Sequence, residues 1–201
     1  MIDTVALIAI TALASFVMGT LAFGFGLIAM PLYTLFIGVK VANPVTTVLL
    51  LLIEIVVIWP IRKHIHVKPM IPLFAGVLLG MPFGVRGLAQ LDESFLRAAL
   101  GVIVVIYLVY DIFLRKKKPE RLPLPVSFTL GAAAGAFTGA ISLPGPLVLI
   151  YVSSLQMEKY ELKASVLFMF LGFTLYKLPL LWLNGLLTEE VVTISNIPAI
   201  R

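Results

Sequence analysis

Three charged side chains stand inside long apolar runs of this chain, where they could bind or move a small ion: Glu54, Arg86 and Lys177. An acid at the centre of a membrane helix is unfavourable by roughly 2.5–3.5 kcal/mol, so such a group usually faces the interior of a helix bundle. Glu54 is therefore either a protonatable coupling residue or the structural partner of a buried cation. Lys177 and Arg86 either attract an anion or extend along their helices to the membrane surface.

The chain lacks the side-chain combinations on which common enzymes depend. It has no cysteine and only two histidines, His64 and His66, which share one basic loop. Thiolate chemistry and a histidine metal cluster are therefore excluded. Ser142, Ser153 and Ser154 have no neighbouring histidine or carboxylate that would activate a nucleophile. We expect a protein that is not an enzyme and that holds no metal or cofactor.

Two stretches rich in glycine and proline, 19–31 and 135–146, interrupt apolar segments that are too long for one straight helix. Residues of these types break the helical ladder of backbone hydrogen bonds. In lipid, the freed N–H and C=O groups are tolerated only where they are buried in protein or line a wet cavity. Each segment is thus predicted to be a helix, a short irregular break and a second helical piece.

The composition requires a membrane environment for the elements that carry these residues. Hydrophobic residues make up 61% of the 201 positions and charged residues 12%, with a mean hydropathy of +1.10. Soluble domains carry roughly 25% charged residues, so a soluble enzyme or a nucleic-acid-binding domain is excluded. The sequence predicts an all-α polytopic membrane protein with six apolar segments, near 4–39, 41–61, 69–90, 94–114, 122–157 and 160–184.

The two breaks also indicate an internal duplication. Gly24 and Gly139 are 115 residues apart, and so are Pro31 and Pro146. The predicted organisation is a first membrane repeat, a basic cytoplasmic linker and an incomplete second membrane repeat, covering residues 1–114, 115–124 and 125–201. Broken helices at matching positions of two homologous halves are typical of the midplane site of a transporter.

The basic residues predict the orientation in the membrane. Loops 61–68 and 115–121 hold eight of the fifteen lysines and arginines. Two spans separate the loops, so both lie on one side, which the positive-inside rule makes cytoplasmic in a multi-pass plasma-membrane protein. Segment 4–39 is expected to cross the membrane once. The alternative is a hairpin turn at Gly24, which would place the N-terminus outside.

The order and repetition of these motifs resemble the sulfite exporter TauE/SafE family. Each half opens with a glycine-rich helix followed by a proline, and the stretches 80–86 and 91–101 are similar to the third and fourth helices of that family. The resemblance covers most of residues 12–190. It implies a permease for sulfite, sulfonates or related anions. The second half stops early, so we expect a fragment, or a shortened relative that completes itself as a homo-oligomer.

A mechanism follows if the two breaks face each other near the midplane. The N-terminal ends of the helical pieces that begin near Leu27 and Leu147 would then direct backbone N–H groups and partial positive charge at one anion. The candidate substrate-binding residues are Gly24, Gly26, Pro31, Ser142, Gly145, Pro146 and Lys177. Arg86 would add long-range attraction, and Glu54 would couple anion movement to a proton or another cation. Alternating access would come from one half moving against the other.

A second hypothesis needs no transport. The chain would then be a structural or assembly subunit of the membrane whose glycines let helices pack closely. Close packing accounts for the glycines but not for prolines at matching places in the two halves. Both hypotheses make the lipid bilayer a partner of the chain and exclude nucleic acid. Only the permease hypothesis includes a small anionic substrate.

Overall fold

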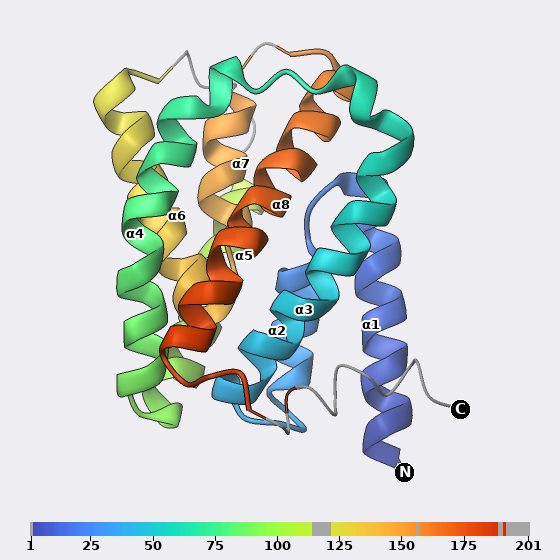
Figure 1. Ribbon diagram of the computed structural model, residues 1–201, viewed down its shortest axis with the longest axis vertical. Coiled ribbons are helices and arrows are strands. Elements are labelled where there is room, and N and C mark those ends of the chain that lie inside the picture. The colour runs from blue at the N-terminus through green and yellow to red at the C-terminus, as the bar shows by residue number, and fades with distance from the viewer. Residues whose placement is uncertain (1, 114–121, 156, 189–190, 192–201) are drawn as a thin grey trace.

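The computed structural model describes residues 2–113, 122–155, 157–188 and 191, which form a bundle of helices (Figure 1). The α-helices are α1 (Ile2–Leu21), α2 (Phe25–Tyr33), α3 (Val39–Ile58), α4 (Ile71–Gln90), α5 (Glu93–Phe113), α6 (Leu124–Ile141), α7 (Gly145–Ser153) and α8 (Lys159–Leu183). Two 3-10 helices, η1 (Trp59–His64) and η2 (Lys68–Met70), connect α3 to α4. No strand occurs within the described ranges.

Within the described residues, four continuous helical stretches are long and apolar enough to cross a membrane: Val39–His64, Lys68–Gln90, Leu124–Ile141 and Lys159–Leu183. Only 39–44% of the most apolar window of each stretch is buried inside the protein, which leaves large apolar side chains such as Val56 and Phe83 on the outer surface. Such a surface suits lipid and not water. The predicted fold class, an all-α polytopic membrane protein, is confirmed.

The first apolar segment is a hairpin and not a single crossing. The hydroxyl of Tyr33, at the end of α2, lies 2.6 Å from Thr11 Oγ1 in the middle of α1, so α2 folds back along α1. Ala22 and Gly24 adopt left-handed conformations, with φ of 68° and 103°, and these reverse the chain between the two helices. The expected single crossing is therefore wrong. The start of α1 lies at the end of the bundle opposite to η1 (Figure 1).

The same order of elements recurs along the chain at a spacing of 120 residues. Matching helix boundaries are Leu21 and Ile141, Phe25 and Gly145, and Val39 and Lys159. Ala22 and Ser142, the two non-glycine residues with positive φ in the described ranges, are also 120 residues apart. The predicted offset of 115 is therefore wrong, because Gly24 lies in the first break whereas Gly139 lies inside α6.

The two matching sets of helices run in opposite directions (Figure 1). The hairpin of α1 and α2 enters from the end where α3 begins, and the hairpin of α6 and α7 enters from the end where α8 begins. Helices α3 and α8 consequently pack against each other in antiparallel orientation. This is the arrangement of an inverted-topology repeat.

Helices α4 and α6 form the closest helix pair in the bundle, because glycines face glycines along their interface. The glycines recur every fourth residue on both helices: Gly76, Gly80 and Gly84 on α4, and Gly131, Gly135 and Gly139 on α6. A Cβ atom at Gly80 would overlap the backbone carbonyl of Ala132, and one at Gly135 would lie 2.8 Å from Val77 Cα. These glycines permit backbone-to-backbone contact.

Candidate functional site

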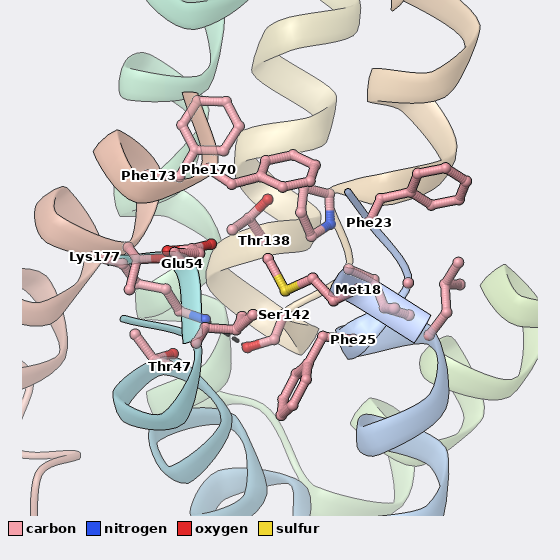
Figure 2. A pocket seen from close by; sticks show the side chains of 17 residues that line it. Met18, Phe23, Phe25, Thr47, Glu54, Thr138, Ser142, Phe170, Phe173 and Lys177 are labelled. Atoms are coloured by element: carbon pink, nitrogen blue, oxygen red, sulfur yellow. Dashed lines mark hydrogen bonds between the residues drawn. The ribbon is translucent and has the colours of Figure 1, made fainter. Parts of the chain in front are cut away.

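The two breaks meet at a cavity between the helices of the bundle (Figure 2). The first break and the start of α2 contribute Gly24, Phe25 and Gly26, and the second break contributes Ser142, Leu143 and Pro144. Helices α3 and α8 complete the wall with polar and aromatic side chains: Thr47, Glu54, Phe170, Phe173, Thr174 and Lys177. The cavity is therefore built from both halves of the chain.

Gly26 explains how the two breaks approach each other so closely. A Cβ atom at this position would overlap the carbonyl oxygen of Ser142 and lie 3.6 Å from the side chain of Leu143. Only glycine lets the first turn of α2 lie against the second break at this distance. The predicted juxtaposition of the two irregular stretches is thus present in the structure.

Lys177 points into the protein and not toward the membrane surface. Its side chain is only 2% exposed, and Nζ donates a hydrogen bond to Ser142 Oγ at 2.7 Å (Figure 2). Ser142 Oγ in turn lies 3.5 Å from the backbone carbonyl of Asn43 on α3. The interpretation of Lys177 as a side chain that extends to the helix end is therefore wrong. Its ammonium group is held at the second break.

Glu54 brings a carboxyl group to the same cavity. Its side chain is 1% exposed, and Thr174 lies beside it in the cavity wall. Its second oxygen, Oε2, has no hydrogen-bond partner among the described residues. Glu54 and Thr174 are 120 residues apart, so equivalent positions of α3 and α8 meet here.

Glu54 and Lys177 interact electrostatically without forming a contact ion pair. Each lies within range of the other's charge. In the part of the chain that the structure describes, however, the only ion pair within 4.0 Å is between Glu93 and Arg97. The cavity thus holds an acidic and a basic side chain that are separated, and each retains capacity for a further partner.

Helix α2 begins at Phe25, in the cavity wall, and α7 begins at Gly145, directly after Pro144 of the wall, rather than near Leu27 and Leu147. No side chain in the described ranges caps either helix. The first helical hydrogen bond of α2 runs from the Ile28 N–H to the Gly24 carbonyl at 3.1 Å. The N–H groups before Ile28 therefore lie outside the helical ladder, and the helix dipole adds partial positive charge at this end.

The structure brings together some of the predicted site residues and leaves others apart. Gly24, Gly26, Ser142, Lys177 and Glu54 line the cavity. Pro31 lies inside α2 and Arg86 is exposed on α4, and neither contributes to the wall. Gly145 and Pro146 begin α7, but their side-chain surroundings lie outside the described part of the structure.

Two threonines that accompany the charged residues were not predicted as site residues from the sequence. Thr47 lies seven residues before Glu54, and Thr174 lies three residues before Lys177, so each shares a helix face with the charge that follows it. That spacing was the available signal, because polar residues on the inward face of a membrane helix usually line a cavity or a helix contact.

The chain matches the family model described as "Sulfite exporter TauE/SafE" over residues 7–200. No curated protein and no solved structure matches the chain. The matched range contains every residue of the cavity wall. The protein is therefore a member of the sulfite exporter TauE/SafE family of membrane transporters.

Proposed function

We propose that this protein moves sulfite or a related sulfonate anion across the plasma membrane through the cavity between the two breaks. The observation that carries the proposal is the position of Lys177, whose ammonium group is buried at the second break and 2.7 Å from the Ser142 hydroxyl. A sulfite or sulfonate group presents several negatively charged oxygen atoms. The ammonium group, the hydroxyl and the free N–H groups at the start of α2 are donors that such oxygens accept.

Glu54 supplies the coupling step of this proposal. When Glu54 is ionised, its negative charge offsets the positive charge of Lys177, and an incoming anion gains little electrostatic stabilisation in the cavity. A proton on Glu54 removes that negative charge and leaves the cavity positive, so the anion and the proton enter together. The unpartnered Oε2 atom, which faces no donor among the described residues, supports this role for Glu54.

The inverted arrangement supports alternating access. We propose that residues 1–114 and 125–201 are the two repeats, joined by the linker 115–124, and that one moves against the other around the cavity. Loop 61–68 is placed on the cytoplasmic side by its basic residues, and the start of α1 consequently lies outside. Loop 115–121 is assigned to the same side by its charge, and it lies outside the described residues.

The competing hypothesis of a structural subunit is favoured by one observation, the glycine-lined contact of α4 with α6. Close packing accounts for those six glycines. It does not account for a cavity that contains a buried lysine and a buried glutamate. Charges in such a place are rare in membrane helices and usually mark the path of an ion or a proton.

The proposal is tested by sulfite flux into proteoliposomes. Lys177→Gln should raise the apparent KM for sulfite by about tenfold or more, the factor expected when a hydrogen bond to a charged group is lost. Lys159→Gln is the matched control, because Lys159 lies on the same helix and is exposed. An unchanged KM in Lys177→Gln would refute the role of Lys177, and absence of sulfite or sulfonate flux in the unmodified protein would refute the transport proposal.

Glu54→Gln separates coupling from binding. The substitution keeps the shape of the side chain and removes its ability to exchange a proton. We expect sulfite flux down a sulfite gradient to persist, whereas a pH gradient alone should no longer drive accumulation. Accumulation equal to that of the unmodified protein would show that the coupling proton is carried elsewhere.

A further inference from the structure

The two breaks leave equivalent backbone carbonyls without a helical partner. The last helical hydrogen bond before the first break runs from the Ala22 N–H to the Met18 carbonyl at 2.8 Å. The last one before the second break runs from the Ser142 N–H to the Thr138 carbonyl at 3.1 Å. The next carbonyls in each chain segment belong to Gly19 and Gly139, which are 120 residues apart. In an uninterrupted helix, each of these carbonyls would accept a hydrogen bond from the N–H group of the residue four positions later. Here those later residues lie inside the breaks and not in a helix.

Each of these two carbonyls accepts a hydrogen bond from a side chain of the opposite half. Asn43 Nδ2 on α3 donates to the Gly139 carbonyl at 3.1 Å. Lys163 Nζ on α8 donates to the Gly19 carbonyl at 2.6 Å. Asn43 and Lys163 are themselves 120 residues apart. Helices α3 and α8 therefore each hold the broken helix of the other half in place, through hydrogen bonds at equivalent positions of the two repeats.

The two equivalent hydrogen bonds differ in their surroundings. Asn43 is fully buried and neutral, and its Oδ1 atom has no partner among the residues that the structure describes. Lys163 is half-buried and charged, and its Nζ atom is also 3.4 Å from the Thr20 carbonyl near the surface. Breaking the Asn43 bond would leave two buried polar groups unpaired, whereas water can replace the Lys163 bond.

We propose that Lys163 is a positioning residue whose bond to Gly19 opens and closes during transport, while the Asn43 bond holds the second break in place. Release of Gly19 frees the end of α1 and with it the first break, which forms one wall of the cavity. Lys163 itself does not line the cavity. The inference rests on the proposed alternating-access function, and it predicts an effect on the rate of turnover rather than on sulfite affinity.

Hydrogen exchange tests the opening of the break without any transport measurement. Lys163→Met removes the donor and keeps the length of the side chain. Exchange in the segment 19–26 should rise by roughly threefold to tenfold, the range that loss of one net hydrogen bond gives. Exchange in the equivalent segment 139–146 should not change. Equal exchange in 19–26 with and without Lys163 would overturn the proposal, whether or not the protein carries sulfite.

Proteoliposome flux then tests the consequence for turnover. We expect Lys163→Met to change kcat for sulfite by about threefold or more while KM stays within about twofold, and Lys163→Arg to restore kcat. Lys40→Met is the control, because Lys40 Nζ also bonds a backbone carbonyl, that of Ala89 at 3.1 Å, away from both breaks. A KM that rises as kcat falls, no rescue by arginine, or an equal effect in Lys40→Met would overturn the proposal.

Discussion

Removing Lys177 alone should destabilise the protein more than removing Lys177 and Glu54 together. Both side chains are almost fully buried in one cavity. Lys177→Met leaves the carboxyl group of Glu54 in the interior without the basic group that faces it. The double variant Glu54→Gln with Lys177→Met has no charge in the cavity. A buried charge without its partner is more unfavourable than the absence of both.

The structure limits how large this coupling can be. The charged atoms of Glu54 and Lys177 are more than 4.0 Å apart, because no ion pair within that distance joins them. Two unit charges at 4 Å interact by about 4 kcal/mol at an effective dielectric constant of 20, and the energy falls with distance. We therefore expect a coupling energy of about 2–3 kcal/mol. Lys177→Met should lower the free energy of unfolding by about 3 kcal/mol, at the lower limit for breaking a buried pair.

The assay is a double-mutant cycle on the purified protein in mixed micelles. Unfolding by sodium dodecyl sulfate can be followed through the fluorescence of Trp59 and Trp182, which the substitutions leave in place. Arg97→Met is the control for loss of an exposed positive charge, because Arg97 forms a surface ion pair with Glu93. It should change the free energy of unfolding by less than about 1 kcal/mol.

Additive effects of the two single substitutions would refute this reasoning. If the coupling energy is within about 0.5 kcal/mol of zero, the two charges do not sense each other and do not share one cavity. The description of the site as a pair of separated opposite charges would then be wrong, and with it the proposed reason why a proton on Glu54 favours anion entry.

Two further predictions concern packing and orientation. Gly80→Ala should lower the free energy of unfolding by about 1–3 kcal/mol, since its Cβ would overlap the backbone of α6, whereas Gly101→Ala, with no described atom within 4 Å, should not destabilise the protein. Equal losses in the same sodium dodecyl sulfate titration would show that the α4–α6 contact is not tight. In intact cells, a cysteine placed at Lys63, in η1, should resist a membrane-impermeant thiol reagent, while one at Asp92 should react. Asp92 follows the end of α4, which lies at the end of the bundle opposite to η1 (Figure 1). The reverse labelling pattern would overturn the orientation.

Several features of the fold and site were predictable from local sequence. Long uncharged runs identified the apolar segments, because a helix in lipid must be apolar along its whole length. Glycine and proline located the two breaks near Gly24 and Ser142, since these residues disrupt the backbone ladder wherever they occur. Lys177 and Glu54 stood out as site candidates because a charge within an apolar segment must find an interior partner or a cavity.

Other features depended on the tertiary structure. Gly24 and Gly139 are the same residue type, but Gly24 lies in the turn of a hairpin and Gly139 packs against α4, and only their neighbours in space distinguish them. The left-handed conformation of Ala22, which helps to turn α2 back along α1, has no sequence signal because alanine is a good helix former. Pro31 and Arg86 were equally plausible site residues until the helix faces were known.

It follows from the sequence alone that this protein is a bundle of membrane helices with two breaks and a few charges inside apolar segments. These properties depend on the transfer of each residue from water to lipid and on local backbone bonding, and both can be evaluated one segment at a time. The packing of the helices shows that the first segment is a hairpin and that equivalent positions are 120 residues apart. It also shows that Asn43 and Lys163 donate hydrogen bonds to the carbonyls freed by the break in the opposite half. Those features depend on which helix faces meet between residues that are up to 144 positions apart in the chain. In lipid, the shape of the helix surfaces and the hydrogen bonds between them determine which faces meet, because the lipid tails are as apolar as the helix faces.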